Sequence, residues 1–141
     1  MDHIAIMGPK WKLIPRILSG EKTIESRWYK TRRAPWGMIH VGDTVYFKDS
    51  GKLITAKATV SSVWSFDHLT IEMAHDIVHK YGKEICIQDH DIATWADGKN
   101  YAILIGLKDP VPVLEPFGID KTGMGAGAAW ITVSSITQIL R

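Results

Sequence analysis

The alternation of apolar and polar residues along the chain predicts short strands interrupted by helices. Apolar or alternating runs rich in β-branched residues are typical of strands when turn residues bound them. Strands are predicted at residues 3–7, 23–29, 41–47, 53–64, 101–107 and 130–134. The third and fourth flank a turn at residues 49–52, so we expect them to pair as a hairpin.

Three segments have the spacing of amphipathic helices: residues 11–19, 68–81 and 89–96. In the second, an apolar face recurs every third or fourth residue, at Leu69, Met73, Ile77 and Tyr81. Asp67 is the predicted N-cap of this helix and Gly82 its stop.

Two further segments are predicted to be irregular. Pro110, Pro112 and Pro116 indicate an irregular crossing, and residues 121–127 a glycine-rich loop. Several strands with a few inserted helices predict an α+β fold, a small β-barrel of about five to six strands with flanking helices. At 141 residues the chain is expected to be one domain, residues 1–141.

Composition narrows the class of protein. No apolar run reaches the length of a membrane span, and the N-terminus lacks the apolar core of a signal peptide, so we expect no membrane association. One cysteine, Cys86, excludes a disulfide scaffold and a cysteine-based zinc site within one chain. These features predict a cytoplasmic location, and nothing in the sequence calls for a cofactor.

The net charge of +2 conceals an uneven distribution. Residues 1–40 hold eight of the seventeen Lys and Arg but only three of the fifteen Asp and Glu, which gives +5, against −3 for residues 41–141. Three of the six tryptophans lie in the basic segment. Cations interleaved with aromatic rings are typical of single-stranded nucleic-acid sites, because every base has a face that stacks.

The strongest local motif is G-x-K-x-x-E-x-R, formed by Gly20, Lys22, Glu25 and Arg27. In a strand, Glu25 and Arg27 point to the same face, where they can exchange charge-assisted hydrogen bonds. The planar fork of arginine also suits phosphate, and Lys22 adds a cation beside it. The motif indicates a cleft for an anionic or polar ligand; the alternative is an exposed strand with a surface ion pair.

This motif after an amphipathic helix, followed by a strand that opens with Val41-Gly-Asp43, resembles the ASCH domain of the PUA-like superfamily. Residues 117–121 and 129–133 are similar to the C-terminal part of some ASCH proteins. The resemblance implies a β-barrel with flanking helices, a basic cleft between barrel and helix, and RNA or nucleoside binding. By the motif, Lys22, Glu25 and Arg27 would line that cleft.

The family also contains enzymes, which leaves a second hypothesis open. One ASCH group is an amidohydrolase on N4-acetylcytidine, with a lysine at the position of Lys22 and a threonine nucleophile where this chain has Glu25. Other members are ribonucleases. If this chain is a hydrolase, Lys22, Glu25 and Arg27 are its candidate catalytic residues, with Lys22 and Arg27 as cations and Glu25 or His40 as base.

Other candidate chemistry is weaker. His68, Glu72, His75 and His79 share one face of the second helix, opposite its apolar face, so we expect a solvated surface and assign no metal site. Cys86 lies between two isoleucines and is expected to be a buried core residue.

We therefore predict an RNA-binding domain whose cleft takes single-stranded RNA or a nucleotide; a protein partner is not specified. The predicted ligand-binding residues are Lys12, Lys22, Glu25, Arg27, Trp28, Arg32, Arg33, Trp36 and Lys121. The cations contact phosphates, Trp28 or Trp36 offers a stacking surface, and Glu25 orients Arg27 or accepts a hydrogen bond from a base.

Overall fold

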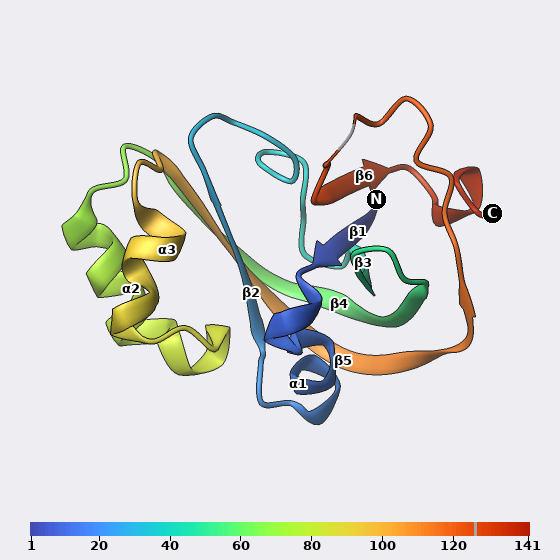
Figure 1. Cartoon of the computed structure of the whole chain (residues 1–141), viewed down its shortest axis with the longest axis horizontal. Helices are drawn as coiled ribbons and strands as arrows, with labels where there is room; N and C mark the ends of the chain where they lie inside the picture. Colours follow the sequence, from blue (N-terminus) through green and yellow to red (C-terminus); the bar gives the residue numbers. More distant parts are fainter. Residues whose placement is uncertain (126) are drawn as a thin grey trace.

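The computed structural model describes residues 1–125 and 127–141, and its strands form one mixed sheet (Figure 1). The strands are β1 (Asp2–Met7), β2 (Ile24–Tyr29), β3 (Thr44–Asp49), β4 (Ile54–Phe66), β5 (Tyr101–Phe117) and β6 (Trp130–Val133). Their order in the sheet is β2-β5-β4-β3-β1-β6. β1 and β3 run parallel and the other neighbours antiparallel, so the predicted hairpin of β3 and β4 is confirmed.

Helices and short 3-10 turns connect these strands. They are η1 (Pro9–Trp11), α1 (Leu13–Ser19), α2 (Ile71–Ile85), η2 (Asp89–Asp91), α3 (Ile92–Ala96) and η3 (Ile136–Gln138). None of the helices in the described part of the chain is long and apolar enough to cross a membrane.

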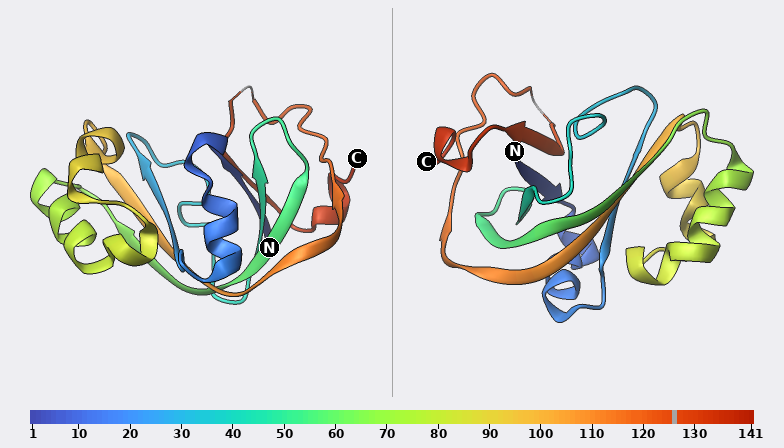
Figure 2. Two further views of the ribbon diagram at one scale, coloured as in Figure 1. Left: turned by 60° about the horizontal axis from the view of Figure 1, so that its bottom comes forward. Right: turned by 180° about the vertical axis from the view of Figure 1, so that it is seen from behind.

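The sheet curls into an open half-barrel, which confirms the predicted α+β class (Figure 2). The long strands β4 and β5 pair along most of their lengths, with register shifts at three places. Such irregularities bend a strand and increase its twist, so they help to curl the sheet. β2 and β6 are left as the two edges of the opening.

The inside of the half-barrel holds the main hydrophobic core. Alternate residues of β3, Val45 and Phe47, are fully buried and point into it. Ile14 and Ile17 of α1 pack into the same core, and α1 lies beneath the curled sheet in Figure 1. This packing fixes the chain that leads from α1 into β2.

A second core lies on the other side of β2, beneath α2 and α3 at one end of the sheet (Figure 1). Ile24 and Trp28 belong to this core, packed with Ile77 and Ile85 of α2. Because side chains alternate along a strand, Glu25 and Arg27 are directed to the opposite, inner side. The prediction that Glu25 and Arg27 lie on the same face of a strand is therefore confirmed.

The predicted boundaries of the second helix were wrong at both ends. The helix begins after Thr70, whose hydroxyl accepts a hydrogen bond from the backbone N–H of Met73 at 3.1 Å, and not after Asp67. It ends at Cys86, in the left-handed conformation at φ 67°. Gly82 lies inside the last turn, where a Cβ atom would come within 2.7 Å of the carbonyl oxygen of Ile87. The glycine thus permits a close approach and does not terminate the helix.

The proline-rich segment was also predicted wrongly, since Pro110, Pro112 and Pro116 lie within β5. β2 pairs with β5 only as far as Gly106, so the later part of β5 has β4 on one side and an open edge on the other. Proline lacks a backbone N–H and is tolerated at such an edge. The strand therefore continues through residues whose local preference is irregular.

Candidate functional site

The three motif side chains meet on β2 and form a buried ion cluster of Lys22, Glu25 and Arg27. The ammonium of Lys22 lies 3.3 Å from Glu25 Oε1, and Arg27 Nη2 lies 3.1 Å from Glu25 Oε2. The exposed fractions of the side chains are 2% for Lys22, 5% for Glu25 and 12% for Arg27. Only Arg27 retains appreciable contact with solvent.

Lys22 joins β2 to the end of α2. Besides Glu25, its ammonium donates to the carbonyl oxygens of Ile24 at 2.9 Å and Ile85 at 2.6 Å. A lysine ammonium has three N–H donors, and three acceptors surround this one. In this arrangement Lys22 has no donor left for a phosphate, so its position supports a structural role in place of the predicted contact.

Glu25 is engaged at both carboxylate oxygens. Its Oε1 also accepts a hydrogen bond from the backbone N–H of Ser26 at 3.0 Å. Burial alone would raise the pKa of Glu25, but the charges of Lys22 and Arg27 outweigh it and hold the pKa below its ordinary value of 4.5. A carboxylate stabilised in its ionised form is a poor proton acceptor, and this disfavours Glu25 as a general base.

Arg27 reaches from one edge of the half-barrel to the other. Its Nη1 donates to the carbonyl oxygen of Ala129 at 3.1 Å, and Nη2 to that of Ile6 at 3.4 Å. The guanidinium also lies 5.1 Å from the ring centre of Trp130 on β6. These contacts span the opening between β2 and β6, so Arg27 is a cation held in a fixed position.

Trp130 is itself held from behind by His3, which is completely buried. The indole N–H of Trp130 donates to His3 Nδ1 at 3.1 Å, and His3 Nε2 lies 2.8 Å from Asp43 Oδ2. Because Nδ1 accepts, the proton of the neutral ring belongs on Nε2, facing Asp43. Burial lowers the pKa of His3 below its ordinary value, although Asp43 acts in the opposite direction.

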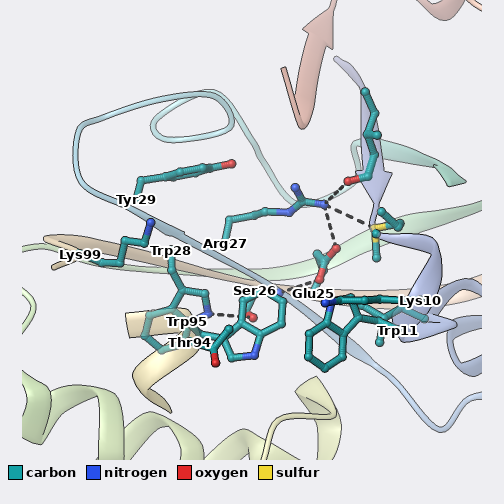
Figure 3. A pocket seen from close by; sticks show the side chains of 14 residues that line it. Lys10, Trp11, Glu25, Ser26, Arg27, Trp28, Tyr29, Thr94, Trp95 and Lys99 are labelled. Atoms are coloured by element: carbon teal, nitrogen blue, oxygen red, sulfur yellow. Dashed lines mark hydrogen bonds and ion pairs between the residues drawn. The ribbon is translucent and has the colours of Figure 1, made fainter. Parts of the chain in front are cut away.

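A pocket of about 440 Å³ opens beside the ion cluster, between the end of β1, η1, β2 and α3 (Figure 3). We call it the aromatic pocket. Its polar and aromatic lining residues are Lys10, Trp11, Glu25, Ser26, Arg27, Trp28, Tyr29, Thr94, Trp95 and Lys99. Its cations come from three separate parts of the chain, and its one carboxylate is already neutralised by the cluster.

Trp11 and Trp95 form the aromatic wall of this pocket. Their ring centres lie 5.6 Å apart at 49°, and Trp11 is 37% exposed. The ammonium of Lys10 lies 5.3 Å from the ring centre of Trp11. Lys12, at φ 51°, separates η1 from α1, so Trp11 does not continue into the helix as predicted.

Four lining residues of this pocket were not predicted from the sequence: Lys10, Trp11, Trp95 and Lys99. The adjacency of Lys10 and Trp11 just after Gly8 and Pro9 was the one local signal, a cation beside an aromatic ring in a loop. Trp95 and Lys99 belong to a segment distant in sequence, and their position beside the pocket depends on the packing of α3 against β2.

Two aromatic residues of β2 also line the aromatic pocket. Trp28 is 6% exposed and donates its indole N–H to Ser26 Oγ at 3.0 Å, so it offers little free face for stacking. The hydroxyl of Tyr29 donates to the carbonyl oxygen of Ala34 at 3.1 Å. Burial raises the pKa of Tyr29, although Arg27 opposes this, so the phenol is neutral at physiological pH.

The predicted basic loop lies next to this region. The guanidinium of Arg32 lies 6.0 Å from the ring centre of Trp36 and 5.6 Å from that of Tyr101. Arg33 lies 6.0 Å from the ring of Tyr29 and, with Tyr29 and Trp130, lines a smaller pocket of about 190 Å³. Tyr29 lines both pockets, so Arg33 lies in a pocket adjacent to the aromatic pocket, whereas Arg32 and Trp36 line neither of the two.

Other predicted residues lie elsewhere. Lys12 is exposed at the start of α1, and Lys121 lines a different pocket with Lys48. His75 and His79 are exposed, with ring centres 6.5 Å apart, and no group of three possible metal ligands occurs in residues 1–125 and 127–141. Cys86 is half-buried, at the end of α2.

Comparisons with solved structures agree with the α+β half-barrel architecture. No protein-family model and no curated protein sequence matches the chain. The crystal structure of ASCH from Zymomonas mobilis matches with a TM-score of 0.70 and 18% sequence identity, over 97% of this chain and 91% of that one. Two mutants of the same protein also match over 97% of this chain, each with a TM-score of 0.71. The Tyr-to-Phe mutant is 18% identical and is covered over 94% of its chain; the Ser-to-Ala mutant is 19% identical and is covered over 92%. The chain has the ASCH fold, as its motif predicted.

Proposed function

We propose that the protein binds single-stranded RNA, or a nucleotide of it, in the aromatic pocket. One observation carries the proposal: a pair of indole rings, the exposed Trp11 and the half-buried Trp95, shares a pocket with Lys10, Arg27 and Lys99. Aromatic faces stack with any base, and cations at the rim contact the phosphates that connect the bases. The resemblance to ASCH domains implies the same class of ligand.

Arg27 is the best-placed phosphate ligand in this proposal. Its guanidinium is already oriented by Glu25 and two backbone carbonyls, so little side-chain entropy remains to be lost on binding. Lys10 and Lys99 are single charges on flexible stems and act as adjustable phosphate contacts. Glu25 has the role of orienting Arg27 that the sequence suggested, and Lys22 supports Glu25.

A hydrolase in the same pocket is the alternative that the motif left open. It needs a group that accepts or donates a proton near the substrate. Lys22 is surrounded by three acceptors and Glu25 is held ionised by two cations, so neither is suited to proton transfer as it stands. We therefore favour binding, in a cytoplasmic protein as the sequence suggests. Cleavage products on incubation with labelled RNA would favour the alternative.

The proposal is tested by titrating a fluorescently labelled single-stranded RNA with the protein at two salt concentrations. Three phosphate contacts predict a slope of about −2 in log K against log salt, so an approximately fourfold rise in salt weakens binding roughly 20-fold. The Lys10→Met variant lowers the magnitude of this slope by about 0.7. Equal affinity at both salt concentrations contradicts the proposal.

Tryptophan variants test the stacking part. Replacing Trp11 or Trp95 by alanine removes one base-stacking surface, which costs about 1–3 kcal/mol of binding free energy. The matched control is Trp64→Ala, because Trp64 is 38% exposed and stacks on Tyr81 outside the aromatic pocket. If Trp64→Ala weakens binding as much as Trp11→Ala does, the ligand does not lie in this pocket.

A further inference from the structure

A second cationic pocket, of about 530 Å³, lies at the junction of β3, the following turn and the C-terminal segment. We call it the lysine pocket. Its charged lining residues are Lys48, Lys52, Lys121 and Arg141. No acidic residue lines it in the described part of the chain, and it shares no lining residue with the aromatic pocket. Four cationic side chains thus line one cavity without an acidic side chain among them.

Lys48 is the informative member of this group. It is only 7% exposed, yet its ammonium forms no hydrogen bond or ion pair with any residue of 1–125 or 127–141. The other buried lysine, Lys22, has three partners. Among the described residues, Asp49 Oδ1 alone is a fully buried side-chain nitrogen or oxygen without a partner. The ammonium of Lys48 is therefore open to the pocket that it lines, where an anionic ligand can pair with it.

The neighbouring acids do not pair with Lys48. Asp49 follows Lys48 in β3, but it forms no ion pair with it and does not line the pocket. Asp120 is engaged with the backbone N–H and hydroxyl of Thr122. Burial lowers the pKa of Lys48, and the charge of Lys121 lowers it further, as expected for two ammonium groups held close together.

We propose that the lysine pocket is a binding site for a ligand with adjacent phosphate groups, separate from the aromatic pocket. Four cations match the charge of a diphosphate or of two neighbouring phosphates in a nucleic-acid strand, and an anion between Lys48 and Lys121 replaces their repulsion by two attractions. Gly51 and Gly118 in the lining leave space for a ligand to approach the backbone.

This site is separate from the proposed RNA site, because the two pockets share no lining residue. Lys121, which was predicted to line the RNA cleft, lines the lysine pocket instead. The two sources of the phosphate, a free diphosphate and an RNA strand, share one chemistry. They are distinguished by titrating the isotopically labelled protein with inorganic pyrophosphate and, separately, with a single-stranded RNA that has a 5′-hydroxyl.

The readout is the backbone amide resonances of residues 48–53 and 118–121. We expect pyrophosphate to shift them, and Lys48→Met to weaken pyrophosphate binding about tenfold. Methionine keeps the apolar part of the side chain, and no protein group loses a hydrogen-bond partner when the ammonium is removed. Lys48→Met is therefore expected to retain the melting temperature of the wild type. Lys121→Met, at a less buried position, provides a second variant with the same expected loss of affinity.

The matched control is Lys57→Met, because Lys57 is an exposed lysine on the adjacent strand β4 and lies outside the lysine pocket. It is expected to bind pyrophosphate as the wild type does. Shifts caused by RNA alone would identify strand phosphates as the ligand and would also support the site. The proposal is overturned if neither ligand shifts these amides, or if Lys57→Met loses as much affinity as Lys48→Met.

Discussion

Replacing Glu25 by glutamine is the sharpest perturbation of the ion cluster, because it keeps the shape of the side chain and removes its charge. The carboxylate of Glu25 faces three donors, which are Lys22, Arg27 and the backbone N–H of Ser26. The amide of glutamine replaces one of its oxygens by an NH2 group, which is itself a donor and cannot accept from them. Lys22 and Arg27 are then buried without a counter-charge. Breaking a buried ion pair in this way costs about 3–5 kcal/mol.

This loss is large enough to measure by thermal unfolding. For 141 residues the entropy of unfolding is about 0.3 kcal/mol/K, so we expect Glu25→Gln to lower the Tm by about 10–17 °C. The control is Glu21→Gln, which breaks only the surface ion pair between Glu21 and Arg16. The exposed fraction is 61% for the side chain of Glu21 and 46% for that of Arg16. That change is expected to cost less than about 1 kcal/mol.

The pH dependence gives an independent check. The pKa of Glu25 is lowered by folding, so the ionised carboxylate stabilises the protein above its ordinary pKa of 4.5. This contribution is lost as pH falls through the lowered pKa, and the difference between wild type and Glu25→Gln shrinks there. A variant within about 1 kcal/mol of wild type at neutral pH refutes the reasoning.

Three further changes test other parts of the structure. Gly82→Ala should destabilise the protein by about 1–3 kcal/mol, because its Cβ meets the carbonyl oxygen of Ile87, despite the better helix propensity of alanine; a gain in Tm is the contrary result. The free energy of unfolding should fall as pH drops below 6.5, because folding lowers the pKa of His3 and the unfolded chain takes up the proton first. His3→Gln should lose this part of the pH dependence, and an unchanged pH profile would show that His3 does not cause it. Arg27→Lys should lower both the Tm and RNA affinity, since a lysine cannot reach the carbonyls of Ile6 and Ala129 with a planar fork; full retention of both properties would rule out the bridging role.

The sequence predicted the local features of the site well. The spacing of Glu25 and Arg27 placed them on one face of a strand, and they form an ion pair there. Strand periodicity alone was enough for this result, because alternation is a property of the backbone. Val45 and Phe47, which alternate within the predicted strand 41–47, are likewise on one face of β3 and belong to the core.

The sequence could not predict which motif residues remain accessible. Lys22 is enclosed because the end of α2 brings the carbonyl oxygen of Ile85 to its ammonium. The partnership of Trp11 with Trp95 likewise depends on how α3 packs against β2. Contacts between distant segments have no local signature, so both outcomes required the three-dimensional structure.

The central claim is that RNA binds in the aromatic pocket, and the most direct test follows the indole N–H resonances of the labelled protein during titration with single-stranded RNA. We predict shifts for Trp11 and Trp95 that saturate with the binding curve, while Trp64 stays unchanged because it stacks on Tyr81 elsewhere. Saturable binding that leaves Trp11 and Trp95 unshifted would contradict the account.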